Sequence, residues 1–343
     1  MVTGGAGFIG GALVERLLSL GYPVVCIDAL TYAANRTRLA DQISRGLDFR
    51  QIDLADAPSL GDAINETRPS VIYHLAAESH VDRSIDGPAP FIQTNVVGTM
   101  NLLEASLRYW KNRARAADDF RLICVSTDEV FGSAPPDGAF DETTNYAPQS
   151  PYSASKAAAD HLVRAWNATY ALPTVVTNCS NNFGPFQFPE KFIPHTVVRA
   201  LTGKTIPLYG DGRHVRDWLN VSDHVDGLLS AASKGRTGGT YLFGGRNTYT
   251  NLEVAERICA ILDDLLPSGG PYRSLVEFVS DRPGHDRRYA IDPVRAETEL
   301  GWSAKTGFQA GLRETVSWYV NNQAWWSEIL AGGYQAERLG VST

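Results

Sequence analysis

Four side chains have the types and spacing that general acid–base chemistry needs: Asp128, Glu129, Tyr152 and Lys156. Tyr152 and Lys156 stand four positions apart, which puts the phenol and the ammonium on one face of a helix. A nearby cation stabilises a tyrosinate, so we expect Lys156 to lower the pKa of Tyr152 and the phenol to act as a base. Asp128 and Glu129 can serve as acid and base if their pKa values diverge. The alternatives are a surface pair for Tyr152 and Lys156, and a capping Asp128 beside an exposed Glu129.

Short apolar runs alternate with amphipathic segments along the first half of the chain. The runs at 24–27, 71–75, 122–125 and 174–177 lack polar alternation, as strands buried on both faces of a parallel sheet do. Helix-like segments lie at 11–20, 60–66, 94–110 and 152–170, and Ser150 and Pro151 mark the start of the last one. This alternation predicts a doubly wound parallel α/β sheet, the Rossmann architecture. Asp128 and Glu129 would then follow a central strand at the carboxyl edge, where such sheets bind ligands.

A glycine-rich turn opens directly into the first helix-like segment, with Gly4, Gly7 and Gly10 at intervals of three. Such a turn brings the backbone close to a pyrophosphate at a helix N-terminus. Asp28 follows the 24–27 run, where a carboxylate can bind ribose hydroxyls and repel a 2′-phosphate. We therefore predict an NAD site, against the alternative of a structural turn with a capping Asp. Only Met1 to Thr3 precede Gly4, so either the first strand is very short or the natural start lies upstream.

The pattern changes past residue 183, where Gly and Pro become frequent. We predict a Rossmann domain over residues 1–183 and a smaller, loop-rich lobe over 184–343 that supplies the second wall of a cleft. The helix-like segment 221–232 and the strand-like run 240–243 are expected to return to the main sheet, within 221–245.

Composition narrows the class of protein. The 343 residues carry 31 Lys and Arg against 38 Asp and Glu, a net charge of −7 with no basic stripe, which argues against a nucleic-acid partner. No run is apolar enough to span a membrane, and the N-terminus does not resemble a signal peptide. Four isolated cysteines read as buried hydrophobic residues, so we expect a cytoplasmic protein. We expect no metal site, because the seven histidines show no metal-ligand spacing.

Several longer motifs, taken together, resemble the nucleotide-sugar 4,6-dehydratases of the extended short-chain dehydrogenase/reductase superfamily, in particular those acting on dTDP-glucose. They lie at 76–84, 126–132, 152–156, 178–185, 188–191, 216–218 and 281–286, and the similarity runs from Gly4 to about Tyr319. The sequence departs from that family's usual pattern at Phe131 and Phe183, where Tyr is common, and in a compact 133–145 loop.

The resemblance implies a lyase that dehydrates dTDP-glucose to dTDP-4-keto-6-deoxyglucose. Tyr152, supported by Lys156, would take the 4-hydroxyl proton while hydride leaves C4 for NAD, and Thr127 would hold that hydroxyl. Glu129 would then remove the C5 proton while Asp128 protonates the departing 6-hydroxyl. Hydride would return to C6.

The resemblance also implies the binding residues. Those for NAD are Gly4, Gly7, Phe8, Ile9, Gly10, Asp28, Leu30, Thr31, Asp53, Leu54, Leu75, Ala77, Ser79, Thr94, Tyr152, Lys156 and Asn182. Those for the nucleotide sugar are Ser79, His80, Thr127, Asn181, Glu190, Lys191, Phe192, Pro207, Tyr209, Arg216, Asn251, Arg282 and His285. Arg216 and Arg282 suit a diphosphate, because guanidinium groups bind phosphate in a bidentate manner.

Three other functions remain open at this point. A nucleotide-sugar 4-epimerase and a UDP-glucuronate decarboxylase share the fold, NAD and the Tyr–Lys pair. By resemblance, epimerases lack both acids and decarboxylases keep only the one at Glu129, so Asp128 separates the three enzymes. A catalytically silent NAD-binding scaffold would have lost one of the four chemical groups. Resemblance further implies a homodimer that packs through segments 94–110 and 152–170, with Ser106 and residues 157–159 as small contact residues.

Overall fold

The computed structural model describes residues 1–112, 120–267 and 269–332. Its main sheet has seven strands, all parallel, in the order β10-β6-β5-β4-β1-β2-β3. Their bounds are β1 (Val2–Thr3), β2 (Val25–Asp28), β3 (Asp48–Gln51), β4 (Val71–His74), β5 (Arg121–Thr127), β6 (Thr174–Cys179) and β10 (Thr240–Phe243). The predicted doubly wound sheet is confirmed. The first strand has two residues, and the Tyr73 N–H beside it donates to the Met1 carbonyl at 2.9 Å.

Helices cover both faces of this sheet because each face carries its own apolar cluster. One cluster joins the sheet to α1 (Phe8–Ser19) and α9 (Val221–Lys234), and α2 (Arg36–Ser44) packs beside α1. The other joins it to α3 (Ala57–Thr67), α6 (Thr99–Asn112) and α7 (Pro151–Tyr170). The predicted cap of α7 is present: the Ser150 hydroxyl accepts from the Ser153 N–H, and Pro151 is the first helical residue. This cap fixes where the helix that carries Tyr152 begins.

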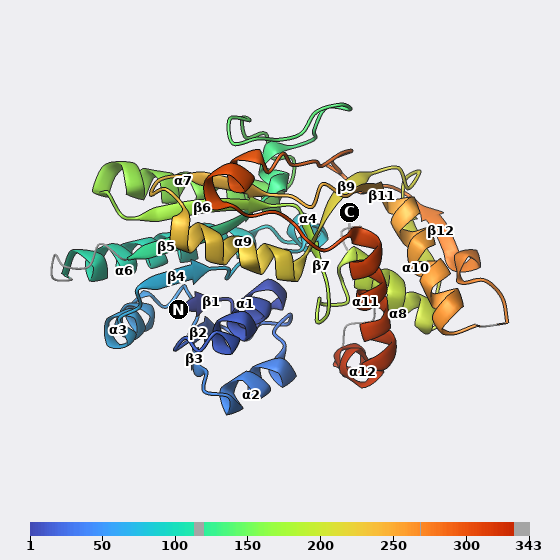
Figure 1. Ribbon diagram of the computed structural model, residues 1–343, viewed down its shortest axis with the longest axis horizontal. Helices are drawn as coiled ribbons and strands as arrows, with labels where there is room; N and C mark the ends of the chain where they lie inside the picture. The colour runs from blue at the N-terminus through green and yellow to red at the C-terminus, as the bar shows by residue number, and fades with distance from the viewer. Residues whose placement is uncertain (113–119, 268, 333–343) are drawn as a thin grey trace.

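The smaller lobe lies at the right of Figure 1. It contains a sheet of β7 (Asn181–Phe183), β9 (Val215–Asn220) and β11 (Thr248–Thr250), and a pair of β8 (Ile206–Tyr209) and β12 (Val276–Val279). Its helices are α8 (Phe192–Leu201), α10 (Asn251–Leu265), α11 (Phe308–Asn321) and α12 (Gln323–Ala331), and they share one apolar core with β7 and β9. Short elements complete the described chain: α4 (Val81–Asp86), α5 (Ala89–Phe91), η1 (Ile92–Gly98), η2 (Asp128–Phe131), η3 (Tyr272–Leu275) and η4 (Ala296–Leu300).

The chain does return to the main sheet after β7, through α9 and β10, where the sequence led us to expect it. The division into domains at residue 183 stays a prediction, and residues 333–343 of the predicted lobe lie outside the described residues.

The segment expected to be one helix over 94–110 is divided. Its first part belongs to η1, a π-helix, and α6 begins only at Thr99. Asn95 explains the division, because its buried side chain accepts from the Glu78 N–H at 2.9 Å and donates to the Ser155 hydroxyl at 2.9 Å. The wider turn thus ties the loop after β4 to α7, a use typical of π-bulges near functional sites.

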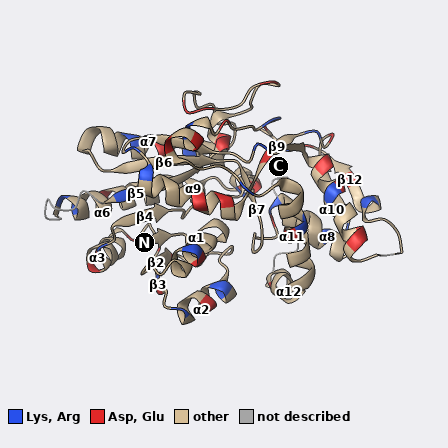
Figure 2. Ribbon diagram, viewed as in Figure 1, with Lys and Arg blue, Asp and Glu red and all other residues tan. Residues whose placement is uncertain are grey.

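Charged residues of both signs are interspersed along the helices (Figure 2). Across the described ranges, no helix is both long enough and apolar enough to traverse a bilayer.

Candidate active site

A cavity of about 320 Å³ lies at the carboxyl edge of the main sheet, where β1, β2, β4 and β5 end. Its walls include nearly every residue predicted to bind NAD: Gly4, Gly7, Phe8, Ile9, Gly10, Asp28, Thr31, Asp53, Leu54, Leu75, Ala77, Ser79, Thr94, Tyr152, Lys156 and Asn182. Leu30 is the exception. It is absent from the lining and packs against the apolar core, with its backbone in the left-handed region at φ 56°. Its N–H donates to Asp28, so Leu30 acts on the cavity only through that carboxylate.

The glycine-rich turn fits a pyrophosphate. Gly4 has φ 71°, and a Cβ there would lie 2.6 Å from the Ala76 backbone nitrogen, so the strand-to-helix turn requires glycine. A Cβ on Gly10 would overlap the Gly4 carbonyl. Gly7 caps α1 without a side chain, so an anion in the cavity can satisfy the N–H groups of the first turn.

Asp28, at the end of β2, is oriented by two backbone N–H groups. One carboxylate oxygen accepts from Ala6 at 3.0 Å and the other from Leu30 at 2.8 Å. Burial raises the pKa of Asp28, and these two hydrogen bonds oppose the rise. The fixed carboxylate suits a ribose diol, as the position of Asp28 after the 24–27 run led us to expect.

The predicted catalytic residues meet where β5 ends. Thr127 is the last residue of β5, and its hydroxyl caps η2 by accepting from the Glu129 N–H at 3.2 Å. Tyr152 lies on the first turn of α7 and lines the same cavity. Thr127, Asp128, Glu129, Tyr152 and Lys156 all line the cavity.

The lowering of the Tyr152 pKa that we expected from Lys156 stays a prediction. Burial raises the pKa of Tyr152 well above its ordinary value, and the Glu129 carboxylate raises it further. Lys156 instead donates to the Val125 carbonyl at 2.8 Å, and burial lowers its own pKa while Asp160 opposes that change. Asp160 is held by the hydroxyls of Ser126 at 2.7 Å and Tyr146 at 2.8 Å. The charge partner of Lys156 among these groups is therefore Asp160, one turn further along α7.

Asp128 and Glu129 have different electrostatic surroundings although they are adjacent. Burial raises the pKa of Asp128 well above its ordinary value, and Glu129 and Asp217 raise it further. Burial also raises the pKa of Glu129, but Arg282, Arg216 and Lys191 all lower it. The pKa of both acids is therefore raised, but three cations oppose the rise at Glu129 and only Arg216 among these cations opposes it at Asp128, which favours Asp128 as the acid and Glu129 as the base.

A second cavity, of about 190 Å³, continues from the first into the smaller lobe. Its walls include the predicted sugar-nucleotide residues Ser79, His80, Asn181, Glu190, Lys191, Phe192, Pro207, Tyr209, Arg216, Asn251, Arg282 and His285. Thr127 lines only the first cavity, whereas Glu129 lines both. A ligand that fills both cavities would therefore pass Glu129 where they join.

The two arginines predicted to bind a diphosphate are both in this second cavity. Arg216 donates to the Asp286 carbonyl at 3.0 Å and lies 4.1 Å from the centre of the Tyr289 ring. Arg282 forms an ion pair of 2.5 Å with Asp82, and its Nε has no partner among the described residues. Two buried guanidinium groups beside a cavity suit a ligand with two negative phosphates.

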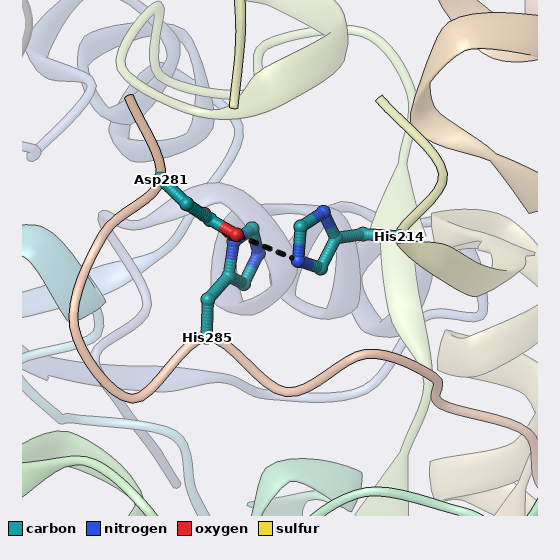
Figure 3. A group of neighbouring side chains, drawn as sticks. All are labelled: His214, Asp281 and His285. Carbon is teal, nitrogen blue, oxygen red and sulfur yellow. Dashed lines mark hydrogen bonds and ion pairs between the residues drawn. The ribbon is translucent and has the colours of Figure 1, made fainter. Parts of the chain in front are cut away.

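His214, Asp281 and His285 form a close group at the edge of the second cavity (Figure 3). Asp281 lies 3.1 Å from Nε2 of His214 and 2.6 Å from Nδ1 of His285, and the two rings stack at 3.7 Å with 12° between their planes. A metal ion binds imidazole nitrogen in the plane of the ring. Rings stacked in this way place their lone pairs in separate planes, so one ion cannot use both without a change of rotamer. The group instead orients His285, which lines the cavity.

Sequence reasoning missed Asp82 and Tyr289, which also line the second cavity. Asp82 accepts from the Tyr209 hydroxyl at 2.8 Å as well as pairing with Arg282. The signal for Asp82 was its place inside the 76–84 motif. Phe131 and Phe183, which stand where Tyr is common in the resembled family, both pack against other aromatic rings. Phe131 stacks on Phe140 at 5.1 Å, and Phe183 contacts Trp218 and Phe308.

Comparisons with known proteins show to which family the chain belongs. A family model described as GDP-mannose 4,6 dehydratase matches residues 1–315. A dTDP-glucose 4,6-dehydratase of Xanthomonas campestris pv. campestris (strain B100) is 51% identical over 347 residues, covering 100% of this chain and 99% of that protein. The chain belongs to the nucleotide-sugar 4,6-dehydratase family.

Solved structures of this family and of related enzymes have the same fold. A crystal structure of dTDP-glucose 4,6-dehydratase from Bacillus anthracis in complex with NAD gives a TM-score of 0.85 at 43% identity, covering 96% of this chain and 98% of that one. UDP-glucose 4-epimerase from Thermus thermophilus gives 0.82 at 30% identity, covering 94% and 98%. The fold alone therefore does not separate a dehydratase from an epimerase, and the residues at the end of β5 must do so.

Replacing Tyr152 by Phe should lower product formation by about 10² to 10⁴, because no other group at that position can take the hydroxyl proton. The assay is steady-state turnover of a nucleotide sugar. Tyr109→Phe is the matched control, because this buried phenol donates to the Pro69 carbonyl, away from both cavities. Turnover of the Tyr152 variant within a few-fold of the parent protein would contradict the role of the phenol.

Proposed function

We propose that the protein is an NAD-dependent dTDP-glucose 4,6-dehydratase that forms dTDP-4-keto-6-deoxyglucose. The observation that carries the proposal is the placement of Asp128 and Glu129 beside Tyr152, where the two cavities join. An epimerase needs no acid for a departing hydroxyl, so Asp128 favours the dehydratase. The 51% identical relative bears the same name.

NAD, when bound along the first cavity, supplies the acceptor and later the donor of the hydride. Tyr152 takes the proton of the 4-hydroxyl, which Thr127 holds. The resulting ketone acidifies C5, and Glu129 removes the C5 proton. Asp128 protonates the 6-hydroxyl as it leaves as water. A proton then returns to C5, so each step uses a group that this chain places at the end of β5.

The smaller lobe would bind the nucleoside diphosphate. Arg216 and Arg282 face the diphosphate, and Tyr209 is available to flank the base because its ring lines the second cavity. Lys191 donates to the Ser79 carbonyl at 2.6 Å, which joins the two lobes beside the sugar position.

We propose further that the protein is a cytoplasmic homodimer. The four cysteines are free and buried, which suits a reducing compartment. The outer face of η1 and α6 exposes Ile92 and Met100, which are apolar residues that a partner could cover. Of the small residues expected at the contact, Ser106, Ala157 and Ala159 are buried inside the subunit, and Ala158 is partly exposed and available to a partner. Light scattering at micromolar concentration should give the mass of a dimer, and a stable monomer would contradict this part.

Incubation with the dTDP, UDP, CDP and GDP forms of glucose tests the nucleotide. We expect the 4-keto-6-deoxy product from dTDP-glucose at a rate at least tenfold above the other three. The measurement is product formation by mass spectrometry, which detects the loss of one water. Interconversion to the galactose form without loss of water would instead favour the epimerase.

Loss of the acid Asp128 and loss of the base Glu129 should have different effects on exchange of the C5 hydrogen. In deuterated water with a 4-keto substrate analogue, Asp128→Asn should still exchange the C5 hydrogen, because Glu129 remains. Glu129→Gln should not exchange it. Both variants should lose turnover by about 10² to 10⁴. The readout is deuterium at C5 by NMR, and Glu104→Gln, on α6 outside both cavities, is the control. Exchange at the parent rate in the Glu129 variant would contradict its role.

A further inference from the structure

Asp82 places a carboxylate in the wall of the second cavity, beside the two arginines that the proposed function assigns to a diphosphate. Its side chain is 7% exposed, so little water surrounds the charge. A carboxylate in this place repels a diphosphate, and the repulsion lowers affinity unless the carboxylate does something else for binding. The contacts that Asp82 makes indicate what this is.

Asp82 holds the guanidinium group of Arg282 by one side. Oδ1 of Asp82 accepts from Nη1 of Arg282 at 2.5 Å, and the arginine side chain is 14% exposed. The other side of a guanidinium carries Nε and Nη2, two parallel donors that can bind a phosphate in a bidentate manner. Nε of Arg282 is buried and has no partner among the described residues. The pair with Asp82 therefore leaves an oriented pair of donors for a ligand.

Arg216, the other arginine of the cavity, is fixed in a different way. It donates to two backbone carbonyls, those of Val215 at 2.8 Å and Asp286 at 3.0 Å. The guanidinium of Arg282 is held by a side chain, that of Asp82. A change at position 82 should therefore disturb Arg282 and leave Arg216 in place.

The second oxygen of Asp82 holds another residue of the same cavity. Oδ2 accepts from the Tyr209 hydroxyl at 2.8 Å. Tyr209 ends β8 and Arg282 lies in the loop after β12, whereas Asp82 comes from α4. This helix is itself tied to the start of α7, because the Ser84 hydroxyl accepts from the Tyr152 N–H at 3.2 Å. One carboxylate on a fixed helix thus orients two side chains of the smaller lobe.

We propose that Asp82 is a positioning residue for the nucleoside diphosphate, an inference that rests on the proposed function. It holds Arg282 ready for the diphosphate and Tyr209 ready for the base. Without it, the ligand would have to order a long arginine side chain on binding, which costs affinity. This gain in orientation exceeds the repulsion between the carboxylate and the phosphates. The two effects have opposite signs: loss of a repulsive charge tightens binding, and loss of a positioning residue weakens it.

The test measures the Kd of dTDP by titration calorimetry on protein loaded with NAD. For Asp82→Ala we expect a Kd at least tenfold above that of the parent protein, although a negative charge is removed. Asp82→Asn can still accept from Arg282 and donate to the Tyr209 oxygen, so we expect a smaller rise, of about threefold. Asp86→Ala, the same change at an exposed position of α4 outside both cavities, is the control and should leave the Kd unchanged.

Steady-state kinetics with dTDP-glucose give a second readout. In Asp82→Ala the KM should rise at least fivefold while kcat changes less than threefold, because Asp82 lines the second cavity and not the first, where Tyr152 and Asp128 lie. A loss confined to kcat would overturn the positioning role.

A Kd of dTDP in Asp82→Ala equal to or below that of the parent protein would also overturn it, because repulsion would then be the only effect of the carboxylate. If Asp82→Ala does not fold, as judged by its failure to retain NAD, Asp82→Asn decides. A raised Kd in that variant supports the proposal, and an unchanged or lowered Kd overturns it. Failure of the parent protein to bind dTDP would instead contradict the proposed function.

Discussion

Burial at the carboxyl end of β5 raises the pKa values of Asp128, Glu129 and Tyr152 together. Three adjacent groups that all retain their protons could supply an acid but no base. The cations that oppose this effect at Glu129 are Lys191, Arg216 and Arg282, and all three come from the smaller lobe. The position of that lobe therefore limits how far burial raises the pKa of Glu129.

Contacts across the cleft hold the lobe in that position. Asp82, on α4, pairs with Arg282 and accepts from the Tyr209 hydroxyl. Arg83, also on α4, donates to Glu190 at 2.9 Å, and Tyr32 from the loop after β2 donates to the same carboxylate at 3.1 Å. Ion pairs with little solvent around them are costly to break, because one partner is then left buried and unpaired. These contacts thus link the walls of both cavities to the electrostatics at Glu129.

Local patterns in the sequence were sufficient for much of this arrangement. The apolar runs located β2, β4, β5, β6 and β10 to within two residues but gave no sign of β3, and Ser150 and Pro151 located the start of α7. The glycine-rich turn and Asp28 located the first cavity because only α1 and β2 lie between them in the chain. The walls of the second cavity could be predicted only from the family resemblance, because residues that meet there, such as His80 and His285, lie 205 residues apart in the chain.

Features that depend on three-dimensional surroundings could not be predicted in this way. The π-helical turn arises from hydrogen bonds that Asn95 makes to Glu78 and Ser155, which no helical periodicity encodes. Leu30 lies next to predicted NAD-binding residues in the sequence, but its side chain packs against the core. Its backbone is in the left-handed region, which the sequence did not indicate. The spacing of Tyr152 and Lys156 was read correctly as one helical face. The direction of the Tyr152 pKa followed from burial instead, which spacing does not report.

A diphosphate in the second cavity would change the balance at Glu129. Its negative charges would lie against Arg216 and Arg282, both of which lower the pKa of Glu129. Partial neutralisation of these cations weakens that effect, so the pKa of Glu129 rises and its carboxylate becomes a stronger base. The same change leaves Asp128 more firmly protonated, because Arg216 also lowers its pKa. Binding of the nucleotide part would thus raise the basicity of an ionised Glu129 and keep Asp128 protonated until the 6-hydroxyl leaves, which gives remote binding energy a direct effect on the chemical step.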